Sequence, residues 1–182
     1  MLGPKKRAML ESQMGALRET LRKRRPDSGE AEQGFRLALL ILGNDALLGT
    51  LGESLCRILA ANPGRRFSDI EYPSSPPEPG VSITERLASE PFEFAGIQFK
   101  AGDRFRFLFQ ALAYSDDPAE RVRIFGFGAR TCLGRALALD IWKDLTSFLS
   151  RLHTRQEVVS FAPRTGDYAF TCPERAMVRL SL

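Results

Sequence analysis

Apolar residues recur at helical spacing in three parts of the chain. Residues 9–25 carry an apolar stripe that ends at Pro26, residues 30–61 continue until Asn62-Pro63-Gly64, and residues 133–149 repeat the pattern. The centre of the second segment is apolar on every side, which predicts a helix that passes through the core. The pattern therefore predicts three helices, of which the second is the longest.

A strand-like alternation replaces this spacing between the second and third helices. Residues 62–80 hold five prolines and predict an irregular connector. Residues 81–110 alternate in short runs with turns at Gly96 and Gly102, which predicts a small sheet. Residues 111–120 fit one short helical piece. The expected fold class is mainly α with small β-sheets (α+β).

These elements predict one domain over residues 1–182, because 182 residues at 43% apolar composition suffice for one core. Two strands, over 157–161 and 168–182, close it as a hairpin. Its expected parts are an N-terminal helix and linker (1–29), a long helix (30–61), a small sheet (81–110), a cysteine turn with its helix (125–155) and a terminal hairpin (156–182).

The charge balance is mildly basic, with a formal net charge of +4. The dense basic cluster, Arg18–Arg25 with Arg22-Lys-Arg-Arg25 at its end, has no interleaved aromatic residues on which bases could stack. We read it as a solvated helix end, with a patch for nucleic acid or another acidic partner as the alternative. No nucleic-acid partner is therefore expected.

The three cysteines, Cys56, Cys132 and Cys172, form no Cys-x-x-Cys pair, which argues for a reducing compartment and against a zinc site. No apolar segment follows the charged N-terminus, so no signal peptide is expected. The longest apolar run, residues 37–42, is too short to span a bilayer. The sequence predicts a cytoplasmic protein without a membrane partner.

One run, Phe125-Gly-Phe-Gly-Ala-Arg-Thr-Cys-Leu-Gly134, places a cysteine at the mouth of the third helix. The amides and positive dipole end of that helix would favour the anionic form of the Cys132 sulfur, which binds metals. Gly128 permits a tight turn, and Gly134 lets a flat ligand approach the helix. Arg130 could neutralise an acidic group on that ligand. The run predicts a thiolate metal site, with a buried structural cysteine as the alternative.

This run resembles the haem-binding signature of cytochromes P-450, Phe-x-x-Gly-x-Arg-x-Cys-x-Gly, at all five defining positions. The resemblance implies haem b as the cofactor, Cys132 as the iron ligand and Arg130 as the partner of a haem propionate. It also implies that Phe125 shields the thiolate and that Gly128 and Gly134 belong to the cofactor-binding turn. Thiolate ligation pushes electron density onto iron and favours O–O cleavage.

Two further segments resemble the same family. Residues 42–46, Leu-Gly-Asn-Asp-Ala, are similar to its distal helix motif, so Gly43 and Ala46 are expected at the haem. Ala46 stands where the family has a proton-passing threonine, and Asp45 is the ionisable side chain that remains. Asp45 is the candidate catalytic residue, and a surface or helix-bending carboxylate is the alternative. Arg86 sits where the family has a second propionate-binding arginine.

The chain departs from the family in length, being less than half as long as usual. The resemblance therefore implies a truncated haem domain that corresponds to the C-terminal half. Aligning Pro76-Pro77 with the family's proline pair puts Ile70 and Pro73 where its Glu-x-x-Arg motif belongs. Loss of a whole buried ion network is tolerated better than loss of one partner, which favours a remodelled fold over a degenerate gene fragment.

The expected function is that of a haem-thiolate enzyme of small-molecule metabolism, acting by an atypical oxidation, with peroxide, or by Lewis-acid chemistry. The alternatives are a non-catalytic auxiliary protein that stabilises a partner and a haem-based sensor. The expected substrate is small and partly apolar, because Leu39, Leu42 and Leu47 accompany Ala46 on the distal helix. A homodimer or a partner protein is expected to cover the haem, and a redox partner is a further expectation.

Overall fold

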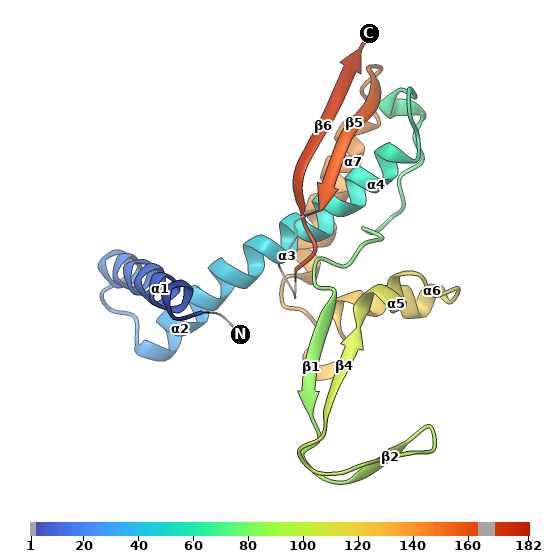
Figure 1. Ribbon diagram of the computed structural model, residues 1–182. Helices are drawn as coiled ribbons and strands as arrows, with labels where there is room; N and C mark the ends of the chain where they lie inside the picture. The colour runs from blue at the N-terminus through green and yellow to red at the C-terminus, as the bar shows by residue number, and fades with distance from the viewer. Residues whose placement is uncertain (1–2, 164–169) are drawn as a thin grey trace. The chain divides into compact units, whose positions relative to one another are not determined.

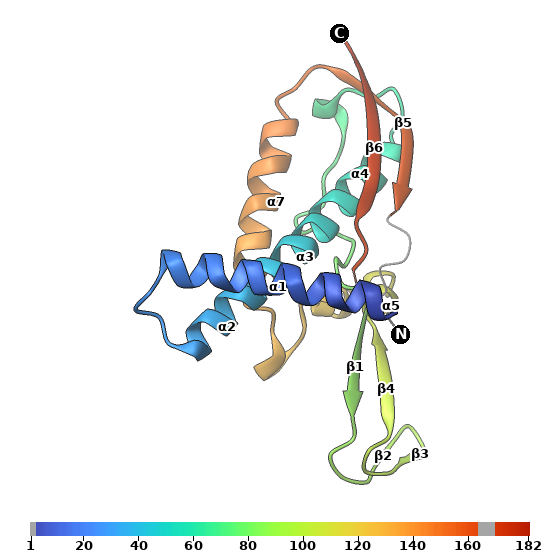
Figure 2. The ribbon, with the colours of Figure 1, turned by 60° about the vertical axis from the view of Figure 1, so that its left-hand side comes forward.

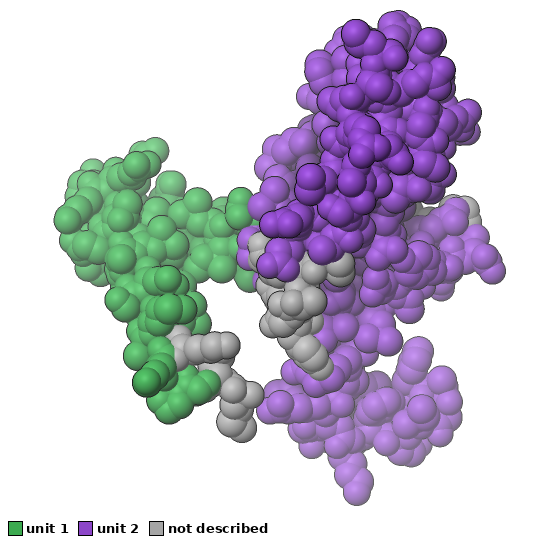
Figure 3. All heavy atoms as spheres, turned by 45° about the horizontal axis from the view of Figure 1, so that its top comes forward, with its two compact units in different colours: residues 1–44 green, residues 45–182 purple. Residues whose placement is uncertain are grey.

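The structure is a computed structural model that describes residues 3–163 and 170–182. The chain divides into two compact units, Met1–Asn44 and Asp45–Leu182, shown in green and purple in Figure 3. We describe each unit separately. The expectation of a single domain over residues 1–182 stays a prediction.

The first unit contains helix α1 (Pro4–Arg24), which begins five residues before the predicted start. Pro4 occupies the first helical turn, where the fixed φ of proline suits a helix and its missing N–H costs nothing. Three basic residues in the last turn complement the negative end of the helix dipole. In the predicted apolar stripe, Met14, Leu17 and Leu21 are half-buried, whereas Met9 and Leu10 are exposed. Helix α1 packs against helix α2 (Glu30–Ala38).

The long predicted helix spans Glu30–Ala60 and contains two π-helical stretches. In order, it consists of α2, η1 (Leu39–Gly43), α3 (Asn44–Leu48), η2 (Gly49–Glu53) and α4 (Ser54–Ala60); the second unit begins within α3, at Asp45. Its length and composition would also allow it to cross a membrane, a criterion that core helices of soluble proteins meet as well.

The expectation that the centre of this helix passes through the core is wrong for several of its leucines, although Leu37 is buried. The side chains of four of them are about half exposed: Leu39, Leu40, Leu42 and Leu48. In the second unit the buried stretch begins at Gly49, where other segments cross the helix closely. Burial therefore follows those crossings rather than the all-round apolar composition.

The core of the second unit lies where α4 meets helix α7 (Arg135–Leu149) and strand β5 (Arg155–Pro163). Leu59, Phe67, Ile70 and Leu149 form its buried centre. Figures 1 and 2 show α4, α7 and the β5–β6 hairpin side by side around it. Trp142 of α7 is fully buried, and its Nε1–H donates to the carbonyl oxygen of Pro73, 2.8 Å away. This bond ties the proline-rich connector to α7.

All six strands belong to two-stranded antiparallel pairs, within the part of the chain that the structure describes. The pairs are β1 (Ile83–Leu87) with β4 (Arg104–Leu108), β2 (Phe92–Phe94) with β3 (Ile97–Phe99), and β5 with β6 (Pro173–Ser181). The small sheet predicted over 81–110 thus forms two pairs. The predicted terminal hairpin is present as the antiparallel pair of β5 and β6. The predicted start of its second strand falls within residues 164–169, which lie outside the described residues.

The prediction of one continuous helix over residues 111–120 is wrong. The structure has α5 (Phe109–Ala113) and α6 (Pro118–Arg121), with Tyr114–Asp117 between them. Asp117 accepts the N–H of Ala119 on its carboxylate, so it starts a new helix instead of continuing the old one. With its long helices and small antiparallel sheets, the chain confirms the predicted α+β fold class.

The connector crosses the long helix at two glycines. A Cβ on Gly80 would overlap the carbonyl oxygen of Ala46, and a Cβ on Gly49 would overlap that of Thr171. The N–H of Gly80 donates to Oγ1 of Thr50 over 2.9 Å, and the N–H of Thr171 donates to the carbonyl oxygen of Gly80 over 3.1 Å. Three distant segments therefore meet backbone to backbone.

Candidate functional site

The cysteine turn is a compact loop closed by its own hydrogen bonds. It runs from η4 (Val122–Phe125) through η5 (Gly128–Arg130) to the start of α7 at Arg135. The N–H of Cys132 donates to the carbonyl oxygen of Phe125 over 2.7 Å, and Oγ1 of Thr131 donates to that of Gly128 over 2.8 Å. The loop thus brings together the five residues of the predicted signature.

Two glycines shape this loop, and the sequence interpretation singled out one of them. Gly126 has φ 81° and Gly128 has φ 57°, both in the left-handed region. A Cβ on Gly126 would overlap the carbonyl oxygen of Arg130, whereas a Cβ on Gly128 would meet nothing within 4 Å. Gly126 is therefore the more constrained position, and its place in the Gly-Phe-Gly sequence is the signal that could have revealed it.

The sulfur of the loop is accessible. Cys132 is exposed, whereas Cys56 and Cys172 are buried. Phe125 is 9% exposed and lies beneath the loop, while the neighbouring Phe127 and Leu133 are 76% and 79% exposed. The predicted alternative of a buried structural cysteine is therefore wrong for Cys132. An exposed thiol flanked by exposed apolar side chains is suited to a large apolar ligand.

These residues fit a haem. Within the described part of the chain, no group of three or more His, Cys, Asp or Glu side chains could hold a metal ion by itself. Cys132 as a single protein ligand suits a metal whose other ligands come from a porphyrin. A Cβ on Gly134 would lie 3.7 Å from the Cys132 sulfur, which places this glycine directly beside the sulfur. Arg130 is exposed and could meet an anionic substituent.

Arg86 lies outside this loop, on strand β1, where its backbone is paired with Phe105 of β4. Its Nη1 donates to Oγ1 of Thr84 and to the carbonyl oxygen of Glu85, each 2.7 Å away. The guanidinium thus binds its own strand. A role in binding a haem propionate stays a prediction.

The residues of the predicted distal motif lie on two units. Gly43 ends the π-helical stretch η1 in the first unit, and Asp45 and Ala46 begin the second. Asp45 and Ala46 are half-buried on α3. The carbonyl oxygen of Ala46 faces Gly80 of the connector. π-helical stretches are frequent at functional sites, but the roles of these three residues stay predictions.

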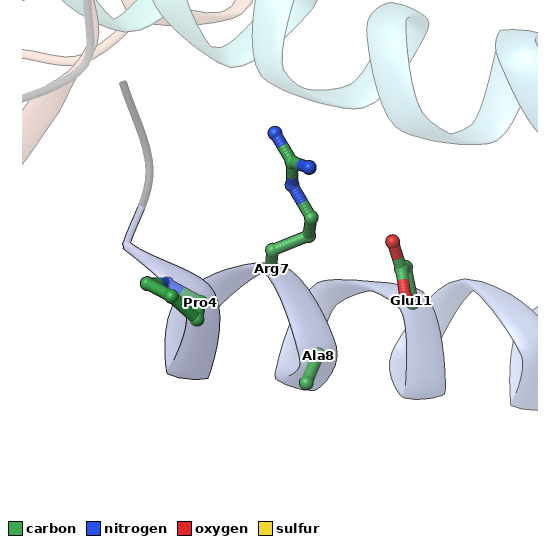
Figure 4. Close-up of a pocket in the computed structure, with 4 residues that line it drawn as sticks. All are labelled: Pro4, Arg7, Ala8 and Glu11. Carbon is green, nitrogen blue, oxygen red and sulfur yellow. The ribbon is translucent and has the colours of Figure 1, made fainter.

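Two hollows lie in the first unit, away from the residues of the cysteine loop in sequence. One lies along α1 and is lined by Pro4, Arg7, Ala8 and Glu11; Arg7 and Glu11 extend from the same side of the helix (Figure 4). The other is formed where the chain turns between α1 and α2. Both are open and lined by a single helix or turn, so neither resembles a substrate pocket.

Comparison with solved structures identifies the fold. The chain matches CYP109B1 from Bacillus subtilis, a versatile cytochrome P450 enzyme, with TM-score 0.74, 18% identity and coverage of 98% of this chain and 61% of that chain. It matches P450 RauA, solved with a biosynthetic intermediate of aurachin RE, with TM-score 0.67, 17% identity and coverage of 100% and 55%. P450BioI, solved with a fatty-acid-ligated acyl carrier protein, matches with TM-score 0.65, 19% identity and coverage of 96% and 55%.

No family profile and no curated protein matches the chain. The solved structures nevertheless show that the chain has a cytochrome P450-like fold. It spans about 55 to 61% of the length of these structures, so the expectation that it is less than half as long as the family is wrong for them. At such identities the similarity concerns the fold, which agrees with the resemblance that the sequence shows around Cys132.

Proposed function

We propose that this chain is a haem-thiolate protein in which Cys132 ligates the iron. The observation that carries the proposal is the exposed thiol of Cys132 on a loop closed by hydrogen bonds, while the other two cysteines are buried. The P450-like fold supports the proposal. So does the loop sequence, which carries all five positions of the haem-binding signature.

The residues of the loop would divide the binding of haem among them. Cys132 would supply the thiolate, and Arg130 would neutralise an anionic substituent. Phe125, buried beneath the loop, would keep water from one side of the sulfur, which lowers the local dielectric. Gly134 would leave room for the macrocycle, and haem b is the form that we propose.

We further propose that the protein is an enzyme acting on a small, partly apolar molecule. When bound, the haem would supply the oxidative or Lewis-acid chemistry, with peroxide as one oxidant. Asp45 would hold or move a proton, because Ala46 beside it has no hydroxyl. Gly43 and Ala46 would leave space along the helix for the ligand.

The decisive test of the haem site is the absorption spectrum of the purified chain, reduced and exposed to carbon monoxide. A far red-shifted Soret band, characteristic of a thiolate–iron–carbon monoxide complex, is expected. Cys132→Ala should abolish the band, while Cys56→Ala and Cys172→Ala should keep it. A colourless chain that does not take up added haemin would refute the proposal.

The catalytic proposal has its own test. Asp45→Asn should keep haem content and the carbon monoxide band but reduce peroxide-dependent oxidation of a chromogenic phenol at least tenfold. The exposed Asp116→Asn serves as the control and should leave the rate unchanged. Equal rates for both variants and the parent would remove Asp45 from the mechanism, whereas a haem-loaded parent without activity would favour the sensor or auxiliary alternatives. A homodimer or a covering partner stays a prediction, which sedimentation of the haem-loaded chain would check.

A further inference from the structure

Two buried carboxylates share one arginine at the junction between η2, α4 and the connector. Glu53 is 3% exposed and Glu78 is 5% exposed. Nε of Arg57 lies 2.9 Å from Oε1 of Glu53 and 3.5 Å from Oε1 of Glu78. All three residues belong to the second unit. The sequence interpretation did not find this cluster, because Glu53 and Glu78 lie 25 positions apart.

The charges of this cluster do not balance when both carboxyls are ionised. Two negative charges face one guanidinium, and the Arg57 side chain is 46% exposed, so water screens part of its charge. Oε2 of Glu53 is buried without a hydrogen-bond partner among the described residues. An uncompensated buried charge is costly, so two buried carboxyls that share one cation usually take up a proton between them.

Hydrogen bonds to Glu78 compensate only part of this excess. The hydroxyl of Tyr114 donates to the Glu78 carboxyl at 3.3 and 3.5 Å, which are long distances. The backbone N–H of Glu78 donates to Oγ of Ser54 over 2.9 Å, which holds the residue in place without neutralising it. Because Nε of Arg57 lies closer to Glu53 than to Glu78, its charge compensates Glu78 less.

We propose that the Glu53–Glu78 pair holds one proton on Glu78 in the folded chain, and that its loss as the pH rises weakens the junction between α4, the connector and α5. Tyr114 directly follows α5, which packs against η4, and η4 ends at Phe125 of the cysteine loop. The Glu53–Glu78 pair is thus connected to the cysteine loop through Tyr114 and the packing of α5 against η4. It does not depend on the proposed haem chemistry.

The groups around the pair support this assignment. Burial raises the pKa of Glu78 above its ordinary value, and the negative charge of Glu53 raises it further, against the opposing effects of Arg57 and Tyr114. Burial and the charge of Glu53 also raise the pKa of the nearby Cys56 thiol, so Cys56 stays neutral and adds no further negative charge. Arg57 is thus the one cation that acts on Glu78 among the described residues.

The sign of the pH dependence follows from the raised pKa of Glu78. The folded chain binds the proton more tightly than the unfolded chain, in which glutamates ionise with a pKa of about 4.3. The stabilisation is therefore complete below about pH 4.3 and is lost as the pH rises through the higher pKa of the folded state. Within that window the unfolding equilibrium constant should rise by up to about tenfold per pH unit.

The experiment measures denaturant unfolding of the full chain from about pH 5 to about pH 9. Variants of single carboxyl residues separate their effects on stability from that of the histidine. The single tryptophan, Trp142, is buried and reports unfolding by its fluorescence. Glu78→Gln, which mimics the protonated acid, should flatten the rise of the unfolding constant with pH. Glu71→Gln, at an exposed position of the same connector, should keep it.

Equal slopes for Glu78→Gln and Glu71→Gln, or no slope in the parent chain, would overturn the proposal. A second measurement needs no variant and so covers the case in which Glu78→Gln does not fold. The raised pKa of Glu78 predicts that the infrared carbonyl band of a protonated carboxyl persists to a higher pH in the folded parent than in the unfolded chain, and fades as the pH rises further. A band that fades at the same pH in both states would also overturn the proposal.

Discussion

The backbone N–H of Cys132 donates a hydrogen bond to the carbonyl oxygen of Phe125, 2.7 Å away. This bond joins the exposed sulfur-bearing residue to a phenylalanine that is 9% exposed, so the loop is anchored from below while its sulfur stays accessible. A rigid backbone under a ligating side chain is what a metal site requires, because the ligand must be held in place before binding.

Gly126→Ala should damage this loop more than Gly128→Ala. Alanine at Gly126 combines a left-handed φ with a clash against the carbonyl oxygen of Arg130, which predicts a loss of about 2 kcal/mol and at least tenfold weaker haemin binding. Alanine at Gly128 carries the φ penalty alone, about 1 kcal/mol. Denaturant unfolding and haemin titration would measure both. Equal effects of the two variants would contradict the loop geometry.

Gly80→Ala should destabilise the second unit strongly. The added Cβ would overlap the carbonyl oxygen of Ala46 and crowd Thr50, so the connector would have to leave the helix, at a cost of about 3 kcal/mol or more. The matched control is Gly34→Ala, in the exposed interior of α2, where nothing lies within 4 Å. That variant should be neutral or more stable by up to about 1 kcal/mol. Thermal unfolding followed by circular dichroism distinguishes them.

Trp142→Phe should cost about 2 to 3 kcal/mol of stability. The change leaves the Pro73 carbonyl oxygen without its donor and removes buried volume from a fully buried site. Phe148→Leu on the same helix is the control; its side chain is 52% exposed, and a change within about 0.5 kcal/mol is expected. Circular dichroism is the suitable probe, since the variant lacks the fluorophore. An unchanged stability of the Trp142→Phe variant would mean that α7 does not hold the connector.

Cys132 should be the one fast-reacting thiol of the folded, haem-free chain. It is exposed, whereas Cys172 is buried and burial raises the pKa of the Cys56 thiol, which keeps it in its unreactive form. A chromogenic disulfide reagent should therefore titrate one thiol per chain quickly and the remaining two only after denaturation. Cys132→Ser should remove the fast phase. Two fast thiols would show that the core around Cys56 or Cys172 opens readily.

Tyr72→Phe should stabilise the chain by about 1 kcal/mol. The Tyr72 hydroxyl is buried without a partner among the described residues, and an unpaired buried hydroxyl is costly. Burial raises the pKa of Tyr72 to about 12, so its phenol stays neutral in the folded state above the pH at which it ionises in the unfolded state. Folding stability should therefore fall as the pH rises above about 10, and Tyr72→Phe should reduce that fall. Denaturant midpoints at neutral and alkaline pH test both statements.

The local elements were predictable because their signals are local. The spacing of apolar residues indicated the helices, and the alternation over residues 81–110 indicated the short strands. The cysteine loop was predictable for the same reason, since its signature lies within ten consecutive residues and its closing bond joins Phe125 to Cys132. Prediction was wrong where neighbours outside the segment decide, as for the exposed leucines of the long helix and the separate helices α5 and α6.

What the sequence by itself determined is the presence of a thiol, a basic side chain and glycines at the spacing of a haem-binding turn, together with the alternation of helices and short strands. The tertiary structure decided which of three cysteines is accessible, that Gly126 rather than Gly128 is the constrained turn residue, and that Glu53 and Glu78 share Arg57. The reason is physical: burial, steric overlap and ion pairing depend on distances between segments far apart in the chain, and local residue patterns do not specify those distances.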